Sequence, residues 1–311
     1  MKQRLIGVVG PTATGKTALG VGLAKCLNGE IVSADSMQLY RGIHIASAAP
    51  DAAEMQGIPH HLIEVLSCTE SCTVADYAEN ARKTVSQIAE RGRQPIVVGG
   101  TGLYVNALFD HTQFVPQVSD PAVRSHLEQE YDALGGEEMW VRLRMTDPET
   151  AARVHPNDKR RIVRALEVFA TTGQTQSQAN RVSHDEESPY EPILIGLTFH
   201  DREVLYDRIN RRVDLMMEAG LLAEAKTTFK KPLGHGMSQA IGHKELYPFL
   251  RGEIPLEEAV ENLKQATRRY AKRQLTWFRR DTRIGWIEVD RTPDVLACAL
   301  KMIAERKEEK F

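Results

Sequence analysis

The sequence predicts an α/β fold: a P-loop-type parallel sheet core flanked by helices, with an inserted all-helical module. Three observations favour this class. Short apolar segments alternate with helical segments through the first hundred residues, which is typical of a parallel sheet covered on both faces. A glycine-rich segment follows the first apolar run directly. Residues 121 to about 181 are helical in pattern throughout and lie between two linker-like stretches.

The core elements follow in order. Continuous apolar runs predict four strands, at Leu5–Val9, Ile31–Ser33, Pro95–Val98 and Ile193–Leu197. A helix is expected from Ala18 to Leu27, where Asn28-Gly29 stops it, and another from Val74 to Arg91, with Thr73 as N-cap and Gly92 beyond its end. Further helices are expected near 201–219, 221–229 and 256–280.

Two polar, proline-containing stretches at 111–121 and 186–192 indicate linkers. We therefore predict a core made of residues 1–114 and 191–311, and an inserted helical module of residues 115–190.

The composition excludes several classes of protein. Among 311 residues, 42% are hydrophobic and the net charge is −2, so any nucleic-acid binding must come from local basic patches. No apolar run reaches the ~18 residues of a membrane span, and the run after Lys2 and Arg4 breaks at Gly10-Pro11, too early for a secretion signal. Four cysteines without a C-x-x-C pair favour a reduced, cytoplasmic protein. His60, His61, Cys68 and Cys72 match no common zinc spacing.

The glycine-rich segment fits the phosphate-binding pattern G-x-x-x-x-G-K-[ST] at each fixed position, and it has the strand–loop–helix context that the pattern requires. We expect phosphate contacts from its backbone amides and from the Lys16 ammonium, with the Thr17 hydroxyl binding a divalent cation. The predicted phosphate-binding residues are Gly10, Thr12, Ala13, Thr14, Gly15, Lys16 and Thr17.

Asp35 follows the second strand and Thr101 follows the third, so both are expected at the same sheet edge as the phosphate loop. Asp35 could simply cap a turn, but beside a bound polyphosphate it could hold a metal ion or accept a proton. The third strand ends in glycines and a threonine rather than in the carboxylate that nucleotide hydrolases use for magnesium.

Two basic clusters suggest contact with a polyanion. Cations dominate one broad side of the run 266–280 in the last helix, including Arg269, Lys272 and Arg273, and Asp281 is the only acid at this run. A solvated helix face is the alternative to a phosphate-binding surface. The second cluster, Lys159-Arg160-Arg161 with Arg164, lies in the helical module. Arg208 and Arg212 share one face of the helix after the fourth strand and could neutralise leaving-group charge or pair with surface acids.

Taken together, these motifs resemble those of the bacterial tRNA dimethylallyltransferase (isopentenyl-tRNA transferase) family over nearly the whole chain. The shared segments are the phosphate loop, Ser33–Tyr40, Pro59–Leu62, Gly99–Tyr104, His155–Asp158, Arg164–Val168, Ala240–Glu245 and Lys272–Trp277. The phosphate loop occurs in many families, but this ordered combination is specific.

The resemblance implies transfer of a dimethylallyl group from dimethylallyl diphosphate to N6 of the adenosine 3′-adjacent to the anticodon, releasing diphosphate, with Mg²⁺ as cofactor. It implies Asp35 as the proton acceptor, with Thr101 and an arginine, Arg212 before Arg208, on the departing oxygen. The tRNA contacts that it implies, together with those of the basic helix, are Asp35, Ser36, Met37, Gln38, Thr101, Val123, Lys159, Arg160, Arg161, Ile162, Val163, Gln239, Gly242, Lys244, Arg269, Lys272 and Arg273.

The chain departs from the family pattern at Ala46 and Ala49, where a glycine and a lysine are usual, and at His243, where an aromatic residue is usual. Three alternatives stay open: a relative that prenylates free adenine nucleotides, a small-molecule or nucleoside kinase, and a non-enzymatic nucleic-acid-binding protein that uses a nucleotide as a switch. A monomer is expected, and the sequence does not identify which tRNAs are modified.

Overall fold

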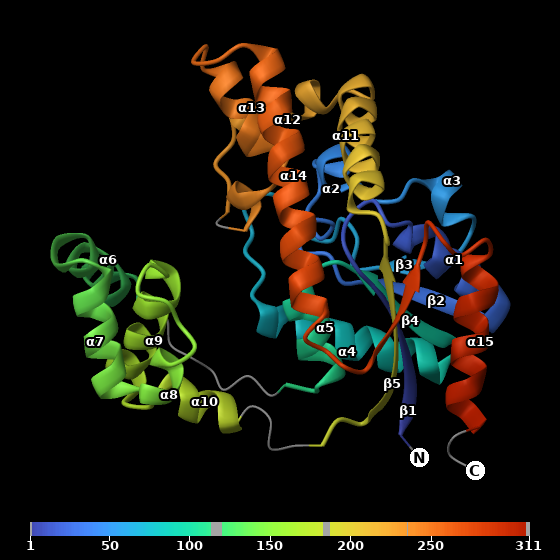
Figure 1. Cartoon of the computed structure of the whole chain (residues 1–311), viewed down its shortest axis with the longest axis horizontal. Helices are drawn as coiled ribbons and strands as arrows, with labels where there is room; N and C mark the ends of the chain where they lie inside the picture. Colours follow the sequence, from blue (N-terminus) through green and yellow to red (C-terminus); the bar gives the residue numbers. More distant parts are fainter. Residues whose placement is uncertain (1, 113–119, 183–186, 235, 309–311) are drawn as a thin grey trace. The chain divides into compact units, whose positions relative to one another are not determined.

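The computed structural model describes residues 2–112, 120–182, 187–234 and 236–308 (Figure 1). The chain forms two compact units, one of Met1–Phe109 with Pro189–Phe311 and the other of Asp110–Ser188. The predicted boundaries, 114/115 and 190/191, differ from these by a few residues. Part of each expected linker, residues 113–119 of the first and residue 186 of the second, lies outside the described residues.

The first unit is built on one sheet of six parallel strands in the order β3-β2-β4-β1-β5-β6. The predicted parallel sheet flanked by helices is therefore confirmed. The strands are β1 (Gln3–Val9), β2 (Gly29–Ser33), β3 (His60–His61), β4 (Gln94–Gly99), β5 (Tyr190–Thr198) and β6 (Ile284–Glu288).

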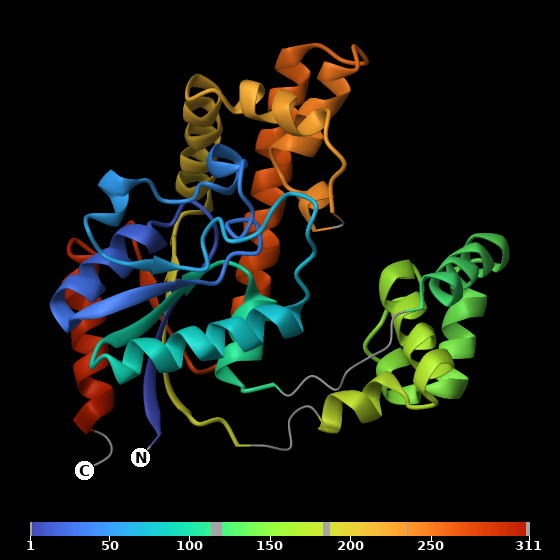
Figure 2. The ribbon, with the colours of Figure 1, turned by 180° about the vertical axis from the view of Figure 1, so that it is seen from behind.

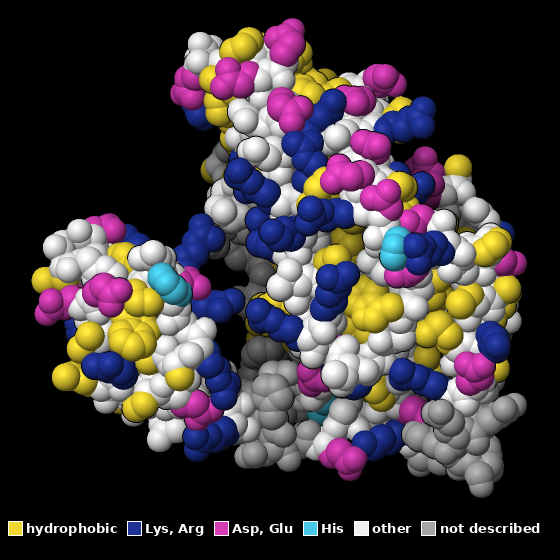
Figure 3. Space-filling view, in the orientation of Figure 1, with side chains coloured by type: hydrophobic (Ala, Val, Ile, Leu, Met, Phe, Trp, Pro, Cys, Tyr) yellow, Lys and Arg dark blue, Asp and Glu magenta, His cyan; other side chains and the backbone are white. Residues whose placement is uncertain are grey.

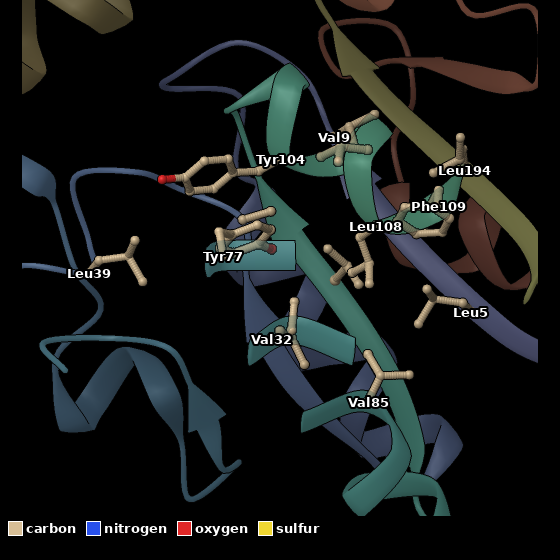
Figure 4. Close-up of a cluster of buried hydrophobic side chains, with 14 of the residues drawn as sticks. Leu5, Val9, Val32, Leu39, Tyr77, Val85, Tyr104, Leu108, Phe109 and Leu194 are labelled. Atoms are coloured by element: carbon tan, nitrogen blue, oxygen red, sulfur yellow. The ribbon is translucent and has the colours of Figure 1, made fainter. Parts of the chain in front are cut away.

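Helices cover both faces of the sheet because alternate strand residues point to opposite faces. Ile6 and Val8 of β1 pack in one core with helices α1 (Lys16–Leu27) and α15 (Val295–Glu308). Leu5 and Val9 pack in the other core with α4 (Val74–Glu90) and α5 (Gly102–Phe109), as Figures 2 and 4 show. In that second core the rings of Tyr77 and Tyr104 stack with centroids 3.9 Å apart.

Four helices form a satellite core in the same unit, centred on Leu221, Leu246 and Leu263. They are α11 (Arg202–Glu218), α12 (Leu221–Phe229), α13 (His243–Leu250) and the long α14 (Leu256–Phe278). Three short elements also belong to this unit: α2 (His44–Ser47) and α3 (Ala52–Met55) between β2 and β3, and the 3₁₀ turn η1 (Met237–Gln239) between α12 and α13. None of the helices in the described residues is long and apolar enough to span a membrane.

The second unit consists of helices in its described residues 120–182, as the sequence predicted. They are α6 (Pro121–Leu134), α7 (Gly136–Thr146), α8 (Pro148–Ala151), α9 (Lys159–Thr172) and α10 (Gln176–Val182). Aspartates begin three of them: the carboxylates of Asp120, Asp147 and Asp158 accept backbone N–H groups of the first turns of α6, α8 and α9. Leu127, Leu143 and other apolar residues from four of these helices form their shared core.

Candidate active site

The phosphate loop joins the buried end of β1 to α1, as predicted. Gly10 adopts a φ of 136°, and a Cβ atom there would lie 2.4 Å from the carbonyl oxygen of Leu197 on β5. Gly15 adopts a φ of 90° at the start of α1. Glycine is needed at both positions because an L side chain would be strained at either φ and, at Gly10, would also meet the neighbouring strand.

The backbone N–H groups of Ala13, Thr14, Gly15, Lys16 and Thr17 have no hydrogen-bond acceptor within the described part of the chain. Ala13 stands in the left-handed region with a φ of 65°, a conformation that concentrates at ligand sites. Consecutive unpaired amides at the start of a helix make an anion-binding nest. We call these five amides the anion nest.

Lys16 supplies the positive charge of the nest. Its Nζ donates to the carbonyl oxygen of Pro11 at 2.6 Å. Burial lowers the pKa of Lys16 to about 7; the Asp35 carboxylate opposes this shift and Arg212 adds to it. The ammonium therefore titrates near neutral pH in the free protein, and a bound anion would favour its charged form.

Asp35 and Thr101 lie together at the carboxyl ends of β2 and β4. The N–H of Thr101 donates to the Ala34 carbonyl at 3.0 Å, and the Thr101 hydroxyl accepts the N–H of Ser36 at 3.0 Å. Gly99 permits this close approach, because a Cβ there would lie 2.2 Å from the Ala34 oxygen. The two strand ends are thus fixed to each other.

The Asp35 carboxylate accepts the N–H of Met37 at 2.9 Å. Burial raises the pKa of Asp35, while the Met37 amide and the Lys16 charge oppose that shift. A carboxylate with a raised pKa is a better proton acceptor than an exposed one. Geometry and charge therefore both fit Asp35 as a general base.

Both predicted arginines of α11 face this site. Arg208 Nε donates to the carbonyl oxygen of Ala13 at 3.1 Å, so Arg208 contacts the phosphate loop directly. Burial lowers the pKa of Arg212, while the carboxylates of Glu54 and Asp35 oppose the shift. Arg212 thus lies in the electric field of Asp35 and Lys16, and no hydrogen bond among the described residues joins it to the loop.

Sequence reasoning missed two polar residues of α14 that reach the same site. Gln274 bonds to both the phosphate loop and the loop after β4. Burial raises the pKa of the Tyr270 hydroxyl; the Asp35 charge adds to this, and hydrogen bonds to Thr101 and Gln274 oppose it. The sequence does carry a signal for them, because both polar side chains lie on the face of α14 that also carries the buried Ala271 and Phe278.

The basic surface of α14 consists of Arg269, Lys272 and Arg273. All three side chains are exposed, and within the described residues none has an ion-pair partner. Lys and Arg side chains gather over this helix in Figure 3. Arg268 behaves differently, because it bonds to Asn210 at 2.5 Å and to Glu261 at 2.9 Å.

In the basic cluster of α9, in the second unit, more of the cations are paired with acids than on the basic surface of α14. Lys159 pairs with Asp132 at 2.5 Å and Arg161 with Asp158 at 3.4 Å, whereas Arg160 has no partner in the described range. Ile162 and Val163 are buried in the core of this unit, and Val123 packs against that core. In this structure the side chains of Ile162 and Val163 are therefore not available to a ligand, and tRNA contacts from this helix stay a prediction.

Three further predicted contacts lie in the segment from η1 to the first turn of α13. Gln239 ends η1, Gly242 precedes α13, and Lys244 lies in its first turn with 42% of its side chain exposed. The unusual His243 is buried between Thr228 and Glu224, with ring-nitrogen distances of 2.9 Å to each.

Glu224 also accepts the N–H groups of Ile45 and Ala46. The departures at Ala46 and His243 therefore belong to one hydrogen-bonded network.

A divalent cation would find few protein ligands here. No group of three His, Cys, Asp or Glu side chains converges anywhere in the described residues. Thr17 offers one half-buried hydroxyl beside the anion nest. This fits Mg²⁺ only as an ion that takes most of its ligands from phosphate oxygens and water, which is its usual mode at phosphate sites.

Comparison with known proteins shows the family to which the chain belongs. The sequence model of the IPP transferase family matches residues 38–281. The chain belongs to this family.

Relatives within the family include the tRNA dimethylallyltransferases of Halalkalibacterium halodurans (48% identical, 93% of this chain and 92% of the relative) and Bacillus subtilis (48%, 94% and 93%). The crystal structure of the tRNA isopentenylpyrophosphate transferase of Bacillus halodurans superposes with a TM-score of 0.73 at 45% identity, covering 99% of this chain and 98% of that one. A eukaryotic dimethylallyltransferase acting on tRNA gives 0.77 at 28% identity, covering 98% and 77%. The family resemblance inferred from the sequence is confirmed.

Proposed function

We propose that this IPP transferase family member transfers the dimethylallyl group of dimethylallyl diphosphate to N6 of the adenosine that follows the anticodon of a tRNA. The observation that carries the proposal is the anion nest with Lys16 beside Asp35, at one edge of one sheet. An anion site next to a basic carboxylate suits a reaction that releases diphosphate and a proton together.

In the proposed step, the bond between the allylic carbon and the ester oxygen on the α-phosphorus breaks, and a bond from adenine N6 to that carbon forms. The N6 proton passes to the Asp35 carboxylate. The electron pair of the broken bond leaves on diphosphate, whose charge the anion nest and Lys16 stabilise. Arg208 and Arg212 stand where they can add positive charge to the leaving group.

We assign the Mg²⁺ ligand to Thr17, with the diphosphate itself supplying further oxygens. When bound, the ion would neutralise charge that develops on the leaving group. The end of β4 supports diphosphate release rather than nucleotide hydrolysis, because Gly99, Gly100 and Thr101 stand where a magnesium-binding acid would be expected.

The unpaired cations on α14 support a polyanionic acceptor. A single-stranded loop base can be turned out into a pocket, which suits an adenosine of the anticodon loop. A free adenine nucleotide would need neither the basic surface of α14 nor a separate helical unit. We further propose that the chain acts as a monomer in the cytoplasm, which light scattering after gel filtration and cell fractionation would test.

The proposal is tested by incubating the protein with labelled dimethylallyl diphosphate and either tRNA or AMP. We expect label in tRNA, and mass spectrometry of its nucleosides should identify N6-dimethylallyladenosine at the position after the anticodon. Label in AMP but not in tRNA would contradict the proposal in favour of the free-nucleotide enzyme. Phosphoryl transfer from ATP without allyl transfer would favour a kinase.

A further inference from the structure

Gln274 joins two loops of the sheet edge through one buried side chain. It lies near the C-terminal end of α14, with 5% of its surface exposed, next to Arg273 of the basic surface. Its Oε1 accepts the N–H of Thr12 in the phosphate loop at 2.9 Å. Its Nε2 donates to the carbonyl oxygen of Gly100, in the loop after β4, also at 2.9 Å.

A primary amide makes this pair of bonds at any pH, because it carries one donor and one acceptor without titrating. A carboxylate could accept from Thr12 but not donate to Gly100, and a thioether of similar length could do neither well. The neighbouring glycine is adapted to the amide, because a Cβ atom at Gly100 would lie 2.1 Å from Nε2. Trp277, one turn further along α14, lies equally close to Gly102, where a Cβ would be 2.2 Å from its ring.

These bonds act on the residues that border the chemistry. Thr12 immediately precedes the anion nest, so its fixed N–H sets where the five free amides begin. Gly100 immediately precedes Thr101, whose hydroxyl bonds to the Asp35–Gln38 loop through Ser36. A site that places a leaving group and a base must hold their supports to within a fraction of an ångström.

We propose that Gln274 is a positioning residue that holds the phosphate loop and the Thr101 loop at a fixed separation from the basic surface of α14. It touches neither reacting atom. The helix that carries the RNA-facing cations thereby shapes the diphosphate site, and loss of the amide weakens diphosphate binding without weakening RNA binding. This inference rests on the proposed function for the identity of the two ligands.

The first test compares the wild type with Q274M, which keeps the length of the side chain but loses the amide. We expect the Kd of inorganic pyrophosphate, measured by calorimetry, to rise ~10-fold, as expected for the loss of two buried hydrogen bonds. The Kd of tRNA should stay within about twofold, and kcat with dimethylallyl diphosphate and tRNA should fall by a similar ~10-fold. The matched control is Q87M, at an exposed glutamine of α4, which should change neither Kd nor kcat.

An unchanged pyrophosphate Kd in folded Q274M would overturn the proposal. So would equal weakening of both ligands together with a large fall in Tm, because that pattern indicates a merely structural role.

The second test separates the amide chemistry from general packing. In Q274E the carboxyl group can accept from Thr12 and donate to Gly100 only when it is protonated. The pyrophosphate Kd of Q274E, taken as a ratio to the wild type at each pH, should therefore move toward unity as the pH falls. A ratio that does not change with pH would contradict the assignment. If the wild type transfers no dimethylallyl group, the proposed function fails, whereas the pyrophosphate measurements still decide the role of Gln274.

Discussion

The sheet-edge site of the first unit and the basic cluster of the second unit hold their functional side chains in opposite ways. At the sheet edge, Asp35 and Thr101 bond to backbone groups, and burial shifts the pKa of Asp35 and Lys16. On α9, Lys159 and Arg161 are paired with acids of their own unit. From this difference we expect the chemistry to depend on the first unit, and we expect Lys159 and Arg161 to bind RNA only if they exchange their acid partners for phosphates.

The largest expected effect is at Asp35. In Asp35→Asn, turnover should fall ~10²–10⁴-fold because the proton acceptor is lost, while tRNA affinity stays close to that of the wild type. In the wild type, kcat should also fall as the pH drops through the raised pKa of Asp35, since only the carboxylate accepts a proton. Single-turnover rates across pH measure both effects. An unchanged rate in D35N would show that Asp35 is not the proton acceptor. The contrast between a catalytic first unit and an RNA-binding second unit would then lose its main support.

The next effect concerns the protonation of Lys16. Because the pKa of Lys16 is about 7 in the free protein, the ammonium is partly deprotonated above that pH, and diphosphate binding should restore the proton. Calorimetry in buffers of different ionisation enthalpy should show uptake of up to about one proton on Lys16 well above pH 7 and little below it. Lys16→Arg is the control, because arginine stays protonated at every pH tested. The proton uptake of this variant therefore measures the titration of the ligand alone, which is subtracted from the wild-type value. Equal uptake in wild type and K16R would show that Lys16 is already charged.

A smaller effect is expected on the basic surface of α14. Replacing Arg269, Lys272 or Arg273 singly by alanine should reduce the slope of log Kd for tRNA against log salt by roughly 0.7–0.9 for each phosphate that is no longer neutralised. Their lack of acid partners among the described residues means that the whole charge is available to RNA. Filter binding over a range of salt concentrations measures the slope. A residue whose replacement leaves the slope unchanged belongs to the solvated face of the helix.

The smallest effect should come from Lys159→Ala on α9. Because Lys159 already pairs with Asp132 at 2.5 Å, its removal should change the salt slope by less than an α14 cation does. Arg160→Ala, at a neighbour without an ion-pair partner among the described residues, is the matched comparison on the same helix. A slope change for K159A as large as that for R273A would show that the ion pair opens freely, and the contrast between the two surfaces would then disappear.

Local pattern was enough for much of the fold. The strands β1, β2, β4 and β5, the helices α1, α4, α11, α12 and α14 and the helical character of residues 121–181 follow from apolar runs, periodicity and the Thr73 cap. The helices α5 and α15 and the two-residue strand β3 were not predicted. The edge strand β6 was missed because only Ile284 and Ile287 are buried, so its sequence lacks a continuous apolar run. Helix α13 was missed because it has eight residues and contains Pro248.

The site was predictable where it depends on a motif at a strand end, as for Lys16, Asp35 and Thr101. Gln274 and Tyr270 were missed, because a polar side chain on the buried face of α14 does not by itself show that this face meets the loop after β4. The pairing of cations could not be predicted either, because Lys159 and Arg268 bond to residues that are distant in the chain.

The contact between Gly10 and Leu197 has a consequence for biosynthesis. The strand β5 runs beside β1 in register from Gln3 opposite Tyr190 to Val9 opposite Gly196, and it follows the whole second unit in the chain. A nascent chain that has not yet reached β5 lacks the neighbour against which Gly10 rests. The phosphate loop, which is translated first, therefore cannot complete its packing until β5 has been translated. Ribosome-stalled chains that end before Tyr190 should not retain pyrophosphate.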